Sequence, residues 1–356
     1  MKNFQNPSIS IAKRSIGIDF PPYVIAEMSA NHNGKIENAF KIIDEAKKNG
    51  ADAIKIQTYS PDTITLNVRN DEFKIFGGKW DGRYLYDLYK EAHMPWEWHK
   101  EIFDHAKSKD LTIFSSPFDS TAVDLLESLN APAYKIASFE AVDLPLIKYV
   151  ANTKKPMIIS TGMCNLDEIK EAINAAQEGG CNELSILHCV SGYPASPSSY
   201  NLKTIPDIID KFDLVTGLSD HTLSNASAVA SIALGSSIIE KHFTLDRYKG
   251  GPDDSFSIEP KDLKLLSDDV RDAWNALGNI DYSLKVSEKG EIKFRRSLYF
   301  IKDLEAGSIL TKNSVRSVRP GFGLAPKYLD RIIGKKLLVN VKKNTPVNKK
   351  FFKDLK

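Results

Sequence analysis

Ionisable side chains recur within short apolar runs, where they could take part in acid–base, metal or phosphate chemistry. Glu27 follows YVIA, Lys55 stands in AIKIQT and Lys135 stands in YKIAS. Glu240 and His242 share the run IIEKHF. A charged side chain inside a buried strand costs free energy unless it is paired or functional. A structural salt bridge could explain any one of these residues, whereas the whole set favours an active site.

Two histidines, His221 in GLSDHT and His242 in IEKHF, are candidate metal ligands. If they end neighbouring strands, which lie about 4.8 Å apart, both imidazoles can bind one divalent ion. Open positions would then remain for water and substrate. The alternative is that each histidine caps its strand by hydrogen bonding. Two imidazoles do not by themselves select manganese over cobalt or zinc.

We expect Lys55 and Lys135 to point toward a common axis, together with the hydroxyls of Ser116, Ser138 and Ser160. Several cations and hydroxyl donors together suit a small ligand that carries both a phosphate and a carboxylate. The alternative chemistry is that of a Schiff-base aldolase, which needs one desolvated lysine and no metal. The lysines alone leave both kinds of enzyme open.

Eight apolar runs alternate with amphipathic segments, such as Ile36–Asn49 and Leu166–Glu178, over residues 23–277. The predicted strands are Val24–Ala30, Ala53–Tyr59, Leu111–Ser116, Ala133–Ile136, Met157–Ser160, Leu184–Cys189, Leu214–Ser219 and Ser237–Phe243. This alternation predicts an α/β fold, a (β/α)8 TIM barrel whose strand ends gather the ionisable residues at one face. A doubly wound open sheet is the alternative, but no GxGxxG follows the first strand. Residues 8–18 could form a hairpin that plugs the barrel floor.

The chain is predicted to contain a barrel at 1–278, a polar linker at 279–293 and a small basic α+β module at 294–356. Its net charge of +2 and hydrophobic content of 42% favour neither nucleic acid nor a membrane as a partner. Three scattered cysteines fit reduced thiols in the cytoplasm. The first 20 residues lack the continuous apolar stretch of a signal peptide.

Seven motifs occur in the order found in the sialic acid (nonulosonic acid) synthase family. They are IAEMSANHNG, KIQTY, SSPFD, YKIAS, STGM, GLSDHT and IEKHFTLDR. SVRPGFGL resembles the SAF (antifreeze-like) domain that follows the barrel in those enzymes. The stretches WDGRYLYDLYKEAHMPWEWH, CVSGYP and GGPDDSFSIEP resemble the pseudaminic acid synthase branch. N-acetylneuraminate synthases typically carry Asn where this chain has Ser191, which argues against that branch. Legionaminic acid synthases are the near alternative.

The resemblance implies the condensation of phosphoenolpyruvate with 2,4-diacetamido-2,4,6-trideoxy-altrose and water. The products would be pseudaminic acid and phosphate, released by C–O cleavage. His221 and His242 would hold a divalent metal, by resemblance Mn²⁺, with Co²⁺ or Mg²⁺ as alternatives. Glu27 would position water or act as a base, and Glu240 would assist. The residues implied to hold phosphoenolpyruvate are Lys55, Ser116, Lys135, Ser138, Ser160 and Ser219. Those implied elsewhere in the substrate site are Gln57, Ser191, Tyr193, Asp253 and Arg319.

The same resemblance implies a domain-swapped homodimer, in which the SAF module closes the partner's barrel and brings Arg319 to the sugar. It also implies a cytoplasmic enzyme whose product serves flagellin or surface polysaccharide. A non-catalytic carbohydrate-binding or ice-binding protein is a third class, suggested by the SAF module alone. The polar strand ends of the barrel argue against that class.

Overall fold

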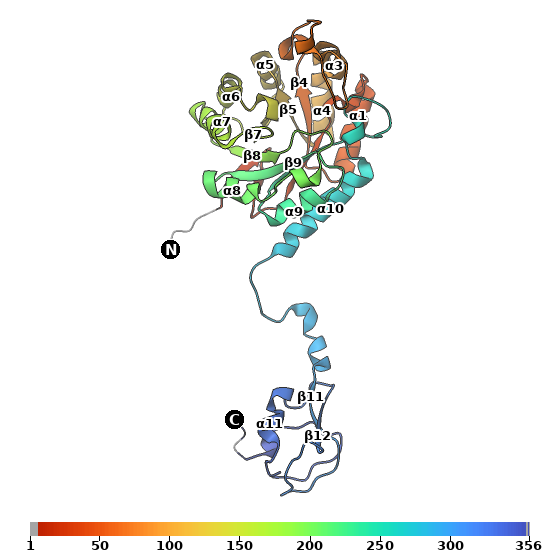
Figure 1. The fold of residues 1–356 in the computed structure, drawn as a ribbon, viewed down its shortest axis with the longest axis vertical. Helices are drawn as coiled ribbons and strands as arrows, with labels where there is room; N and C mark the ends of the chain where they lie inside the picture. The colour runs from red at the N-terminus through yellow and green to blue at the C-terminus, as the bar shows by residue number, and fades with distance from the viewer. Residues whose placement is uncertain (1–5, 354, 356) are drawn as a thin grey trace. The chain divides into compact units, whose positions relative to one another are not determined.

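The computed structural model describes residues 6–353 and residue 355, and the chain divides into two compact units (Figure 1). The first unit ends at Gly278, and the second begins at Asn279. Within the described part of the chain, no helix is long and apolar enough to cross a membrane.

Eight parallel strands of the first unit close into a barrel, with the neighbour order β10-β3-β4-β5-β6-β7-β8-β9. The strands are β3 (Tyr23–Glu27), β4 (Ala53–Thr58), β5 (Thr112–Pro117), β6 (Tyr134–Ile136), β7 (Met157–Ser160), β8 (Leu184–Cys189), β9 (Val215–Asp220) and β10 (Ile238–His242). The predicted (β/α)8 TIM barrel is confirmed. The doubly wound alternative is wrong, because β10 pairs with β3 and closes the sheet.

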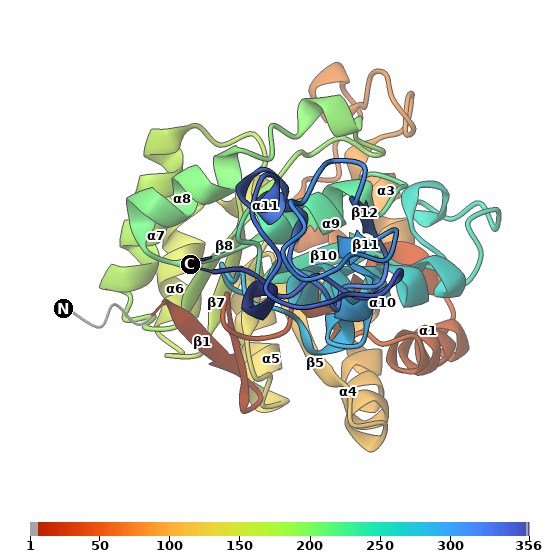
Figure 2. The same ribbon diagram turned by 90° about the horizontal axis from the view of Figure 1, so that it is seen from below.

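Helices follow the strands and surround the barrel (Figures 1 and 2). They are α1 (Ile36–Lys48), α2 (Pro61–Ile64), α3 (Leu85–Ala92), α4 (His99–Ser108), α5 (Ser120–Ser128), α6 (Leu144–Ala151), α7 (Leu166–Glu178), α8 (Thr204–Phe212), α9 (Ala226–Ala233) and α10 (Pro260–Leu277). The start of α7 shows how local sequence sets a boundary. Asn165 accepts hydrogen bonds from the N–H groups of Asp167 and Glu168, and the Glu168 carboxylate accepts one from the Asn165 N–H, which forms a capping box.

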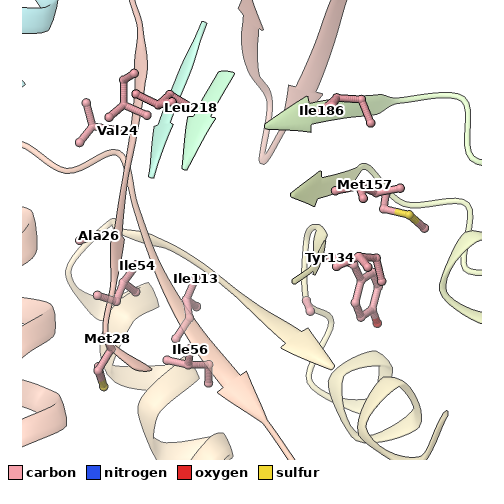
Figure 3. Close-up of a cluster of buried hydrophobic side chains, with 14 of the residues drawn as sticks. Val24, Ala26, Met28, Ile54, Ile56, Ile113, Tyr134, Met157, Ile186 and Leu218 are labelled. Carbon is pink, nitrogen blue, oxygen red and sulfur yellow. The ribbon is translucent and has the colours of Figure 1, made fainter. Parts of the chain in front are cut away.

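Alternation along each strand separates two layers of side chains. On β4, Ile54 and Ile56 join the apolar layer between strands and helices, part of which is shown in Figure 3. Ala53 belongs instead to a second apolar cluster, inside the barrel. Lys55 and Gln57 have the same parity as Ala53 but lie nearer the carboxyl end of the strand. The barrel interior is therefore apolar at its floor and polar at its upper end.

An antiparallel hairpin of β1 (Ser8–Ile11) and β2 (Arg14–Gly17) precedes the barrel. Its Ile9, Ile11 and Ile16 are buried in the same cluster as the apolar residues of the barrel interior. The predicted hairpin plug is thus confirmed.

The first predicted strand was too long. β3 ends at Glu27, and Ser29–His32 form the 3-10 helix η1. Ser29 has a φ of 45°, which takes the chain out of the sheet. Its hydroxyl therefore reaches the site from a loop, rather than from a strand position two residues after Glu27.

The second unit has its own apolar core, formed around Leu298, Phe300, Leu310 and Ile332. Strands β11 (Ser297–Phe300) and β12 (Val315–Val318) pair in an antiparallel manner, and α11 (Leu329–Ile332) is a short helix. The 3-10 helix η7 (Val286–Glu288) lies within the stretch predicted as a linker, and η8 (Glu291–Phe294) begins there.

Candidate active site

Four buried charges form one network at the carboxyl ends of the barrel strands. The Lys55 Nζ lies 2.9 Å from the Glu27 Oε2 and 3.4 Å from the Glu240 Oε1. The Lys135 Nζ lies 2.9 Å from the same Glu240 oxygen. Each side chain is 6% exposed or less, so water screens these charges little. Two predicted hydroxyl residues contact the network: Ser116 accepts from Lys55 at 3.3 Å, and Ser219 donates to Glu240 at 3.5 Å.

The environment shifts the pKa values of the two carboxyl groups in opposite directions. Burial raises the pKa of Glu27, and Lys55 only partly offsets this effect. Burial also acts on Glu240, but Lys135 and Lys55 outweigh it and lower the pKa of this carboxyl group. Glu240 is therefore the permanent counter-ion of the two lysines. Because the pKa of Glu27 is raised and that of Glu240 is lowered, Glu27 is the stronger base of the pair.

Small polar residues follow β6 and end β7 at the carboxyl side of the barrel. The Ser138 Oγ accepts a hydrogen bond of 3.0 Å from the Gly162 N–H. A side chain at Gly162 would collide with the hydroxyls of both Ser138 and Ser191, so only glycine lets these two hydroxyls lie so close to the backbone at this position. The hydroxyls of Ser160 and Ser191 are buried without a hydrogen-bond partner among residues 6–353 and 355. Unpartnered buried hydroxyls are expected where a ligand supplies the missing partner.

His221 directly follows β9, His242 is the last residue of β10, and their imidazole rings lie next to each other. Their ring centroids are 5.4 Å apart, and the ring planes meet at 59°. The Val190 carbonyl lies 2.8 Å from the His221 Nδ1, which leaves Nε2 as the nitrogen available to a ligand. The His242 Nδ1 is buried without a hydrogen-bond partner in the described structure. Burial, followed by the electrostatic effects of His221 and Lys55, lowers the pKa of His242 well below its usual value and keeps this imidazole neutral.

The histidine pair fits a divalent metal ion. Metal–nitrogen distances of about 2.1 Å place the centroids of two imidazole ligands roughly 4.5–5.3 Å apart, close to the separation observed here. No cluster of three or more His, Cys, Asp or Glu side chains suited to a metal occurs in the described part of the chain. Two imidazoles would therefore be the protein ligands, and water or substrate would complete the coordination.

Aromatic rings surround the histidine pair. The Tyr193 ring lies 4.4 Å from His221 and 5.1 Å from Phe256, measured between centroids. Phe256 in turn lies 5.1 Å from His242. Trp80, from the long segment between α2 and α3, lies 6.1 Å from Tyr193 and donates a hydrogen bond to the Pro252 carbonyl. One side of the site is therefore an apolar wall.

A chain of hydrogen bonds links the charge network to the loop that follows β10. Gln57 Nε2 donates to the Glu27 Oε1 and to the Ser29 Oγ, both at 2.9 Å. The Ser29 Oγ donates to the Asp253 Oδ2 at 2.5 Å. The predicted residues Gln57 and Asp253 thus belong to one connected site with Glu27.

Two residues that the sequence reasoning missed adjoin the site. Glu140 follows Ser138 in the 3-10 helix η4 (Ser138–Glu140), and burial raises its pKa to about 7. Burial alone would raise the pKa of Cys189, but His221 lowers it to about 7. An acidic residue just after the YKIAS run was a usable signal for Glu140. The contact between Cys189 and His221 joins the end of β8 to the residue that follows β9, and it has no local sequence signal.

Arg319 lies in the second unit, where it is exposed just after β12. The first unit brings every other predicted site residue to the upper end of the barrel. The roles assigned to these residues, and Arg319 as a sugar ligand, stay predictions.

The NeuB family model matches residues 42–282, and the SAF domain model matches residues 295–353. The chain therefore belongs to the NeuB family. In this chain an SAF domain follows the barrel. Among curated proteins, it is 42% identical to a pseudaminic acid synthase of Helicobacter pylori, over 92% of this chain and 97% of that protein. It is 35% identical to an N,N'-diacetyllegionaminic acid synthase of Legionella pneumophila, over 91% and 92%.

A solved structure of a sialic acid synthetase also resembles this chain. An N-acetylneuraminic acid synthetase from Leptospira borgpetersenii, in complex with citrate, matches with a TM-score of 0.72 and 29% identity. The match covers 82% of this chain and 96% of that protein. The chain is thus a nonulosonic acid synthase by family, and it is most similar in sequence to the pseudaminic acid branch among the three relatives compared.

Proposed function

We propose that this enzyme is a pseudaminic acid synthase, which condenses phosphoenolpyruvate with 2,4-diacetamido-2,4,6-trideoxy-altrose. The observation that carries the proposal is a buried two-lysine network beside two facing imidazoles, in a chain 42% identical to a named pseudaminic acid synthase. In the reaction, C3 of phosphoenolpyruvate attacks the aldehyde carbon and water adds at C2. Phosphate then leaves with its bridging oxygen, and a nine-carbon 2-keto acid remains.

Lys55 and Lys135 would bind the phosphate and carboxylate of phosphoenolpyruvate. Both ammonium groups are held in place by Glu240 before substrate arrives, so their positions cost little reorganisation on binding. The unpartnered hydroxyls of Ser160 and Ser191 and the nearby Ser138 would donate to the same anion. Lys55 is a poor Schiff-base nucleophile, because Glu240 and Glu27 overcome the effect of burial and raise its pKa.

Glu27 would direct the attacking water. Its Oε1 is fixed by Gln57, and its raised pKa suits a group that takes a proton from water and passes it on. Water that adds at C2 must lose a proton for the tetrahedral carbon to release phosphate. Glu27 is the buried carboxyl group within the lysine network that is able to receive it.

His221 and His242 would hold the divalent metal, proposed to be Mn²⁺, which when bound supplies Lewis-acid polarisation of the aldehyde oxygen. Asp253, fixed by Ser29, would accept hydrogen bonds from sugar hydroxyl or amide groups. The aromatic wall of Tyr193 and Phe256 would contact the C6 methyl group, which needs no hydrogen-bond partner.

We also propose that the active form is a domain-swapped homodimer. Residues 1–278 carry 29 Lys and Arg against 39 Asp and Glu, whereas residues 279–356 carry 19 against 7. The opposite net charges of the two units favour docking of the basic module on a barrel, and the family resemblance assigns that barrel to the partner. Arg319 would then enter the partner's site as a sugar ligand. The proposed location is the cytoplasm, and the proposed use of the product is flagellin or surface-polysaccharide glycosylation.

The test combines phosphate release with isotope labelling. Phosphoenolpyruvate labelled with ¹⁸O at its bridging oxygen is mixed with the sugar, Mn²⁺ and the protein. We expect equal amounts of phosphate and nine-carbon acid, with the label in phosphate. Release of unlabelled phosphate would contradict C–O cleavage. Borohydride trapping of a lysine with substrate, without any need for phosphoenolpyruvate, would favour an aldolase instead.

A further inference from the structure

A second buried ion pair lies directly behind the two histidines. The Lys241 Nζ lies 2.6 Å from the Asp220 Oδ2, and the two side chains are 2% and 0% exposed. Asp220 is the last residue of β9, and Lys241 is its direct partner in the pairing of β9 with β10. The pair therefore sits one residue before His221 and His242 on their respective chain segments.

The pair interrupts an otherwise apolar face. Strand alternation turns Lys241 to the same side as Ile239, and Asp220 to the same side as Leu218. Ile239 and Leu218 are fully buried in the layer between strands and helices. A buried ion pair commonly stabilises a fold no better than apolar residues of similar size. Its position beside the histidines therefore calls for a reason other than stability.

The Lys241 ammonium also binds the backbone that follows His221. It donates to the Thr222 carbonyl at 2.5 Å, to the Ser224 carbonyl at 3.0 Å and to the Thr222 hydroxyl at 3.3 Å. The Asp220 Oδ1 accepts a hydrogen bond of 2.9 Å from the Thr222 N–H. Asp220 and Thr222, the residues on either side of His221, thus both contact the Lys241 ammonium group. Lys241 is in turn the residue before His242.

We propose that the Asp220–Lys241 pair is a positioning device that holds His221 and His242 at the separation one divalent ion requires. This inference rests on the proposed metal site. Neither charged group contacts the substrate side of the strands, so their effect passes through the backbone of the two histidines. Loss of the pair should release the turn at Thr222 and allow His221 to move relative to His242.

The test is Mn²⁺ binding by the full-length protein, followed through the electron paramagnetic resonance signal of free Mn²⁺. In the double variant Asp220→Asn/Lys241→Met, both charges are removed at nearly constant volume. We expect its dissociation constant for Mn²⁺ to rise by about 10- to 100-fold, as for other groups that orient metal ligands. At saturating Mn²⁺ the double variant should regain most of the kcat of the unaltered protein. Its KM for phosphoenolpyruvate should equal that of the unaltered protein at every Mn²⁺ concentration.

The control is Arg14→Met/Asp52→Asn, which removes the Arg14–Asp52 ion pair where the hairpin meets the start of the barrel, together with the second contact of Asp52, to Arg271. We expect this control to bind Mn²⁺ as the unaltered protein does. Equal Mn²⁺ affinity of the Asp220→Asn/Lys241→Met variant and the unaltered protein would overturn the inference. Absence of Mn²⁺ binding by the unaltered protein would instead overturn the proposed metal site, and the inference with it.

A second variant covers the case in which the double variant does not fold. Thr222→Val keeps the size of the side chain but removes the hydroxyl that contacts Lys241 and donates to the Ser224 carbonyl. We expect a rise of about threefold or more in the Mn²⁺ dissociation constant, the effect of losing one hydrogen bond. An unchanged constant in a folded Thr222→Val protein would overturn the positioning role.

Discussion

Replacing Glu240 by Gln would remove the only negative charge that touches both buried lysines among the described contacts. Its Oε1 lies 2.9 Å from the Lys135 Nζ and 3.4 Å from the Lys55 Nζ. In the variant, Glu27 would be left to neutralise Lys55, and Lys135 would lose its carboxylate partner. We therefore predict that Glu240→Gln strongly destabilises the ligand-free protein.

The size of the effect follows from distance and burial. At an effective dielectric constant of about 20, each of the two contacts is worth roughly 5 kcal/mol of attraction before desolvation is subtracted. Breaking a buried ion pair by removal of one partner typically costs about 3–5 kcal/mol net. We expect the free energy of unfolding of the barrel to fall by that amount at pH 7.

Urea unfolding followed by tryptophan fluorescence measures this change. All four tryptophans lie within residues 1–278, so the signal reports on the barrel rather than on the second unit. The control variant is Glu178→Gln, which removes the carboxylate of an exposed pair with Lys148. An exposed pair is worth about 1 kcal/mol or less, so the control should lose little stability.

The pH dependence gives an independent check. The folded-state pKa of Glu240 is lowered, so its contribution to stability is present above the unfolded-state pKa, which is about 4.3. That contribution is lost as the pH falls below this value toward the lower folded-state pKa. The stability difference between Glu240→Gln and the unaltered protein should therefore be constant from pH 7 to about 5 and shrink at lower pH. A loss no larger than that of Glu178→Gln, or a difference that grows on acidification, would refute the reasoning.

Exhaustive chelation should abolish phosphate release, and Mn²⁺ or Co²⁺ should restore it; full activity with no metal by elemental analysis would contradict a metal at His221 and His242. Ser191→Asn should lower kcat/KM for the diacetamido sugar at least tenfold, because Ser191 packs against Gly162 and a longer side chain must project into the site. Arg319→Ala should lower kcat/KM for the sugar by about 1.5–3 kcal/mol, or tenfold to a few hundredfold, with the KM for phosphoenolpyruvate unchanged. Mixing Arg319→Ala with His221→Ala should restore partial activity if the second unit serves the partner's barrel, and no gain despite proven subunit exchange would place it on its own barrel.

The barrel and the inward-facing polar residues were predictable because strand alternation is local. The parity that groups Ala53, Lys55 and Gln57 is a two-residue repeat, visible without knowledge of the fold. Once the strands were placed in a closed barrel, the C-terminal strand ends had to converge. His221 and His242 could be paired for the same reason.

Contacts made by loops, or by residues on the outward side of the strands, were not predictable. Ser29 bridges Gln57 and Asp253 only because a positive φ ends β3 early. Lys241 occupies an outward strand position that alternation reserves for apolar residues, and its partner Asp220 is 21 residues away. The sequence pattern shows that a charged residue, Lys241, stands at an apolar strand position. Only the register of β9 and β10 shows that Asp220 neutralises its charge.

The choice of sugar tests the proposed function most directly. The metal-loaded protein would be incubated with phosphoenolpyruvate and, separately, with 2,4-diacetamido-2,4,6-trideoxy-altrose, the isomer used by legionaminic acid synthases, and N-acetylmannosamine. We predict that kcat/KM for the altrose derivative exceeds that for N-acetylmannosamine by about 100-fold or more, and that the product has the mass and proton couplings of pseudaminic acid. Equal or faster turnover of N-acetylmannosamine, or a preference for the legionaminic isomer, would contradict the proposed function.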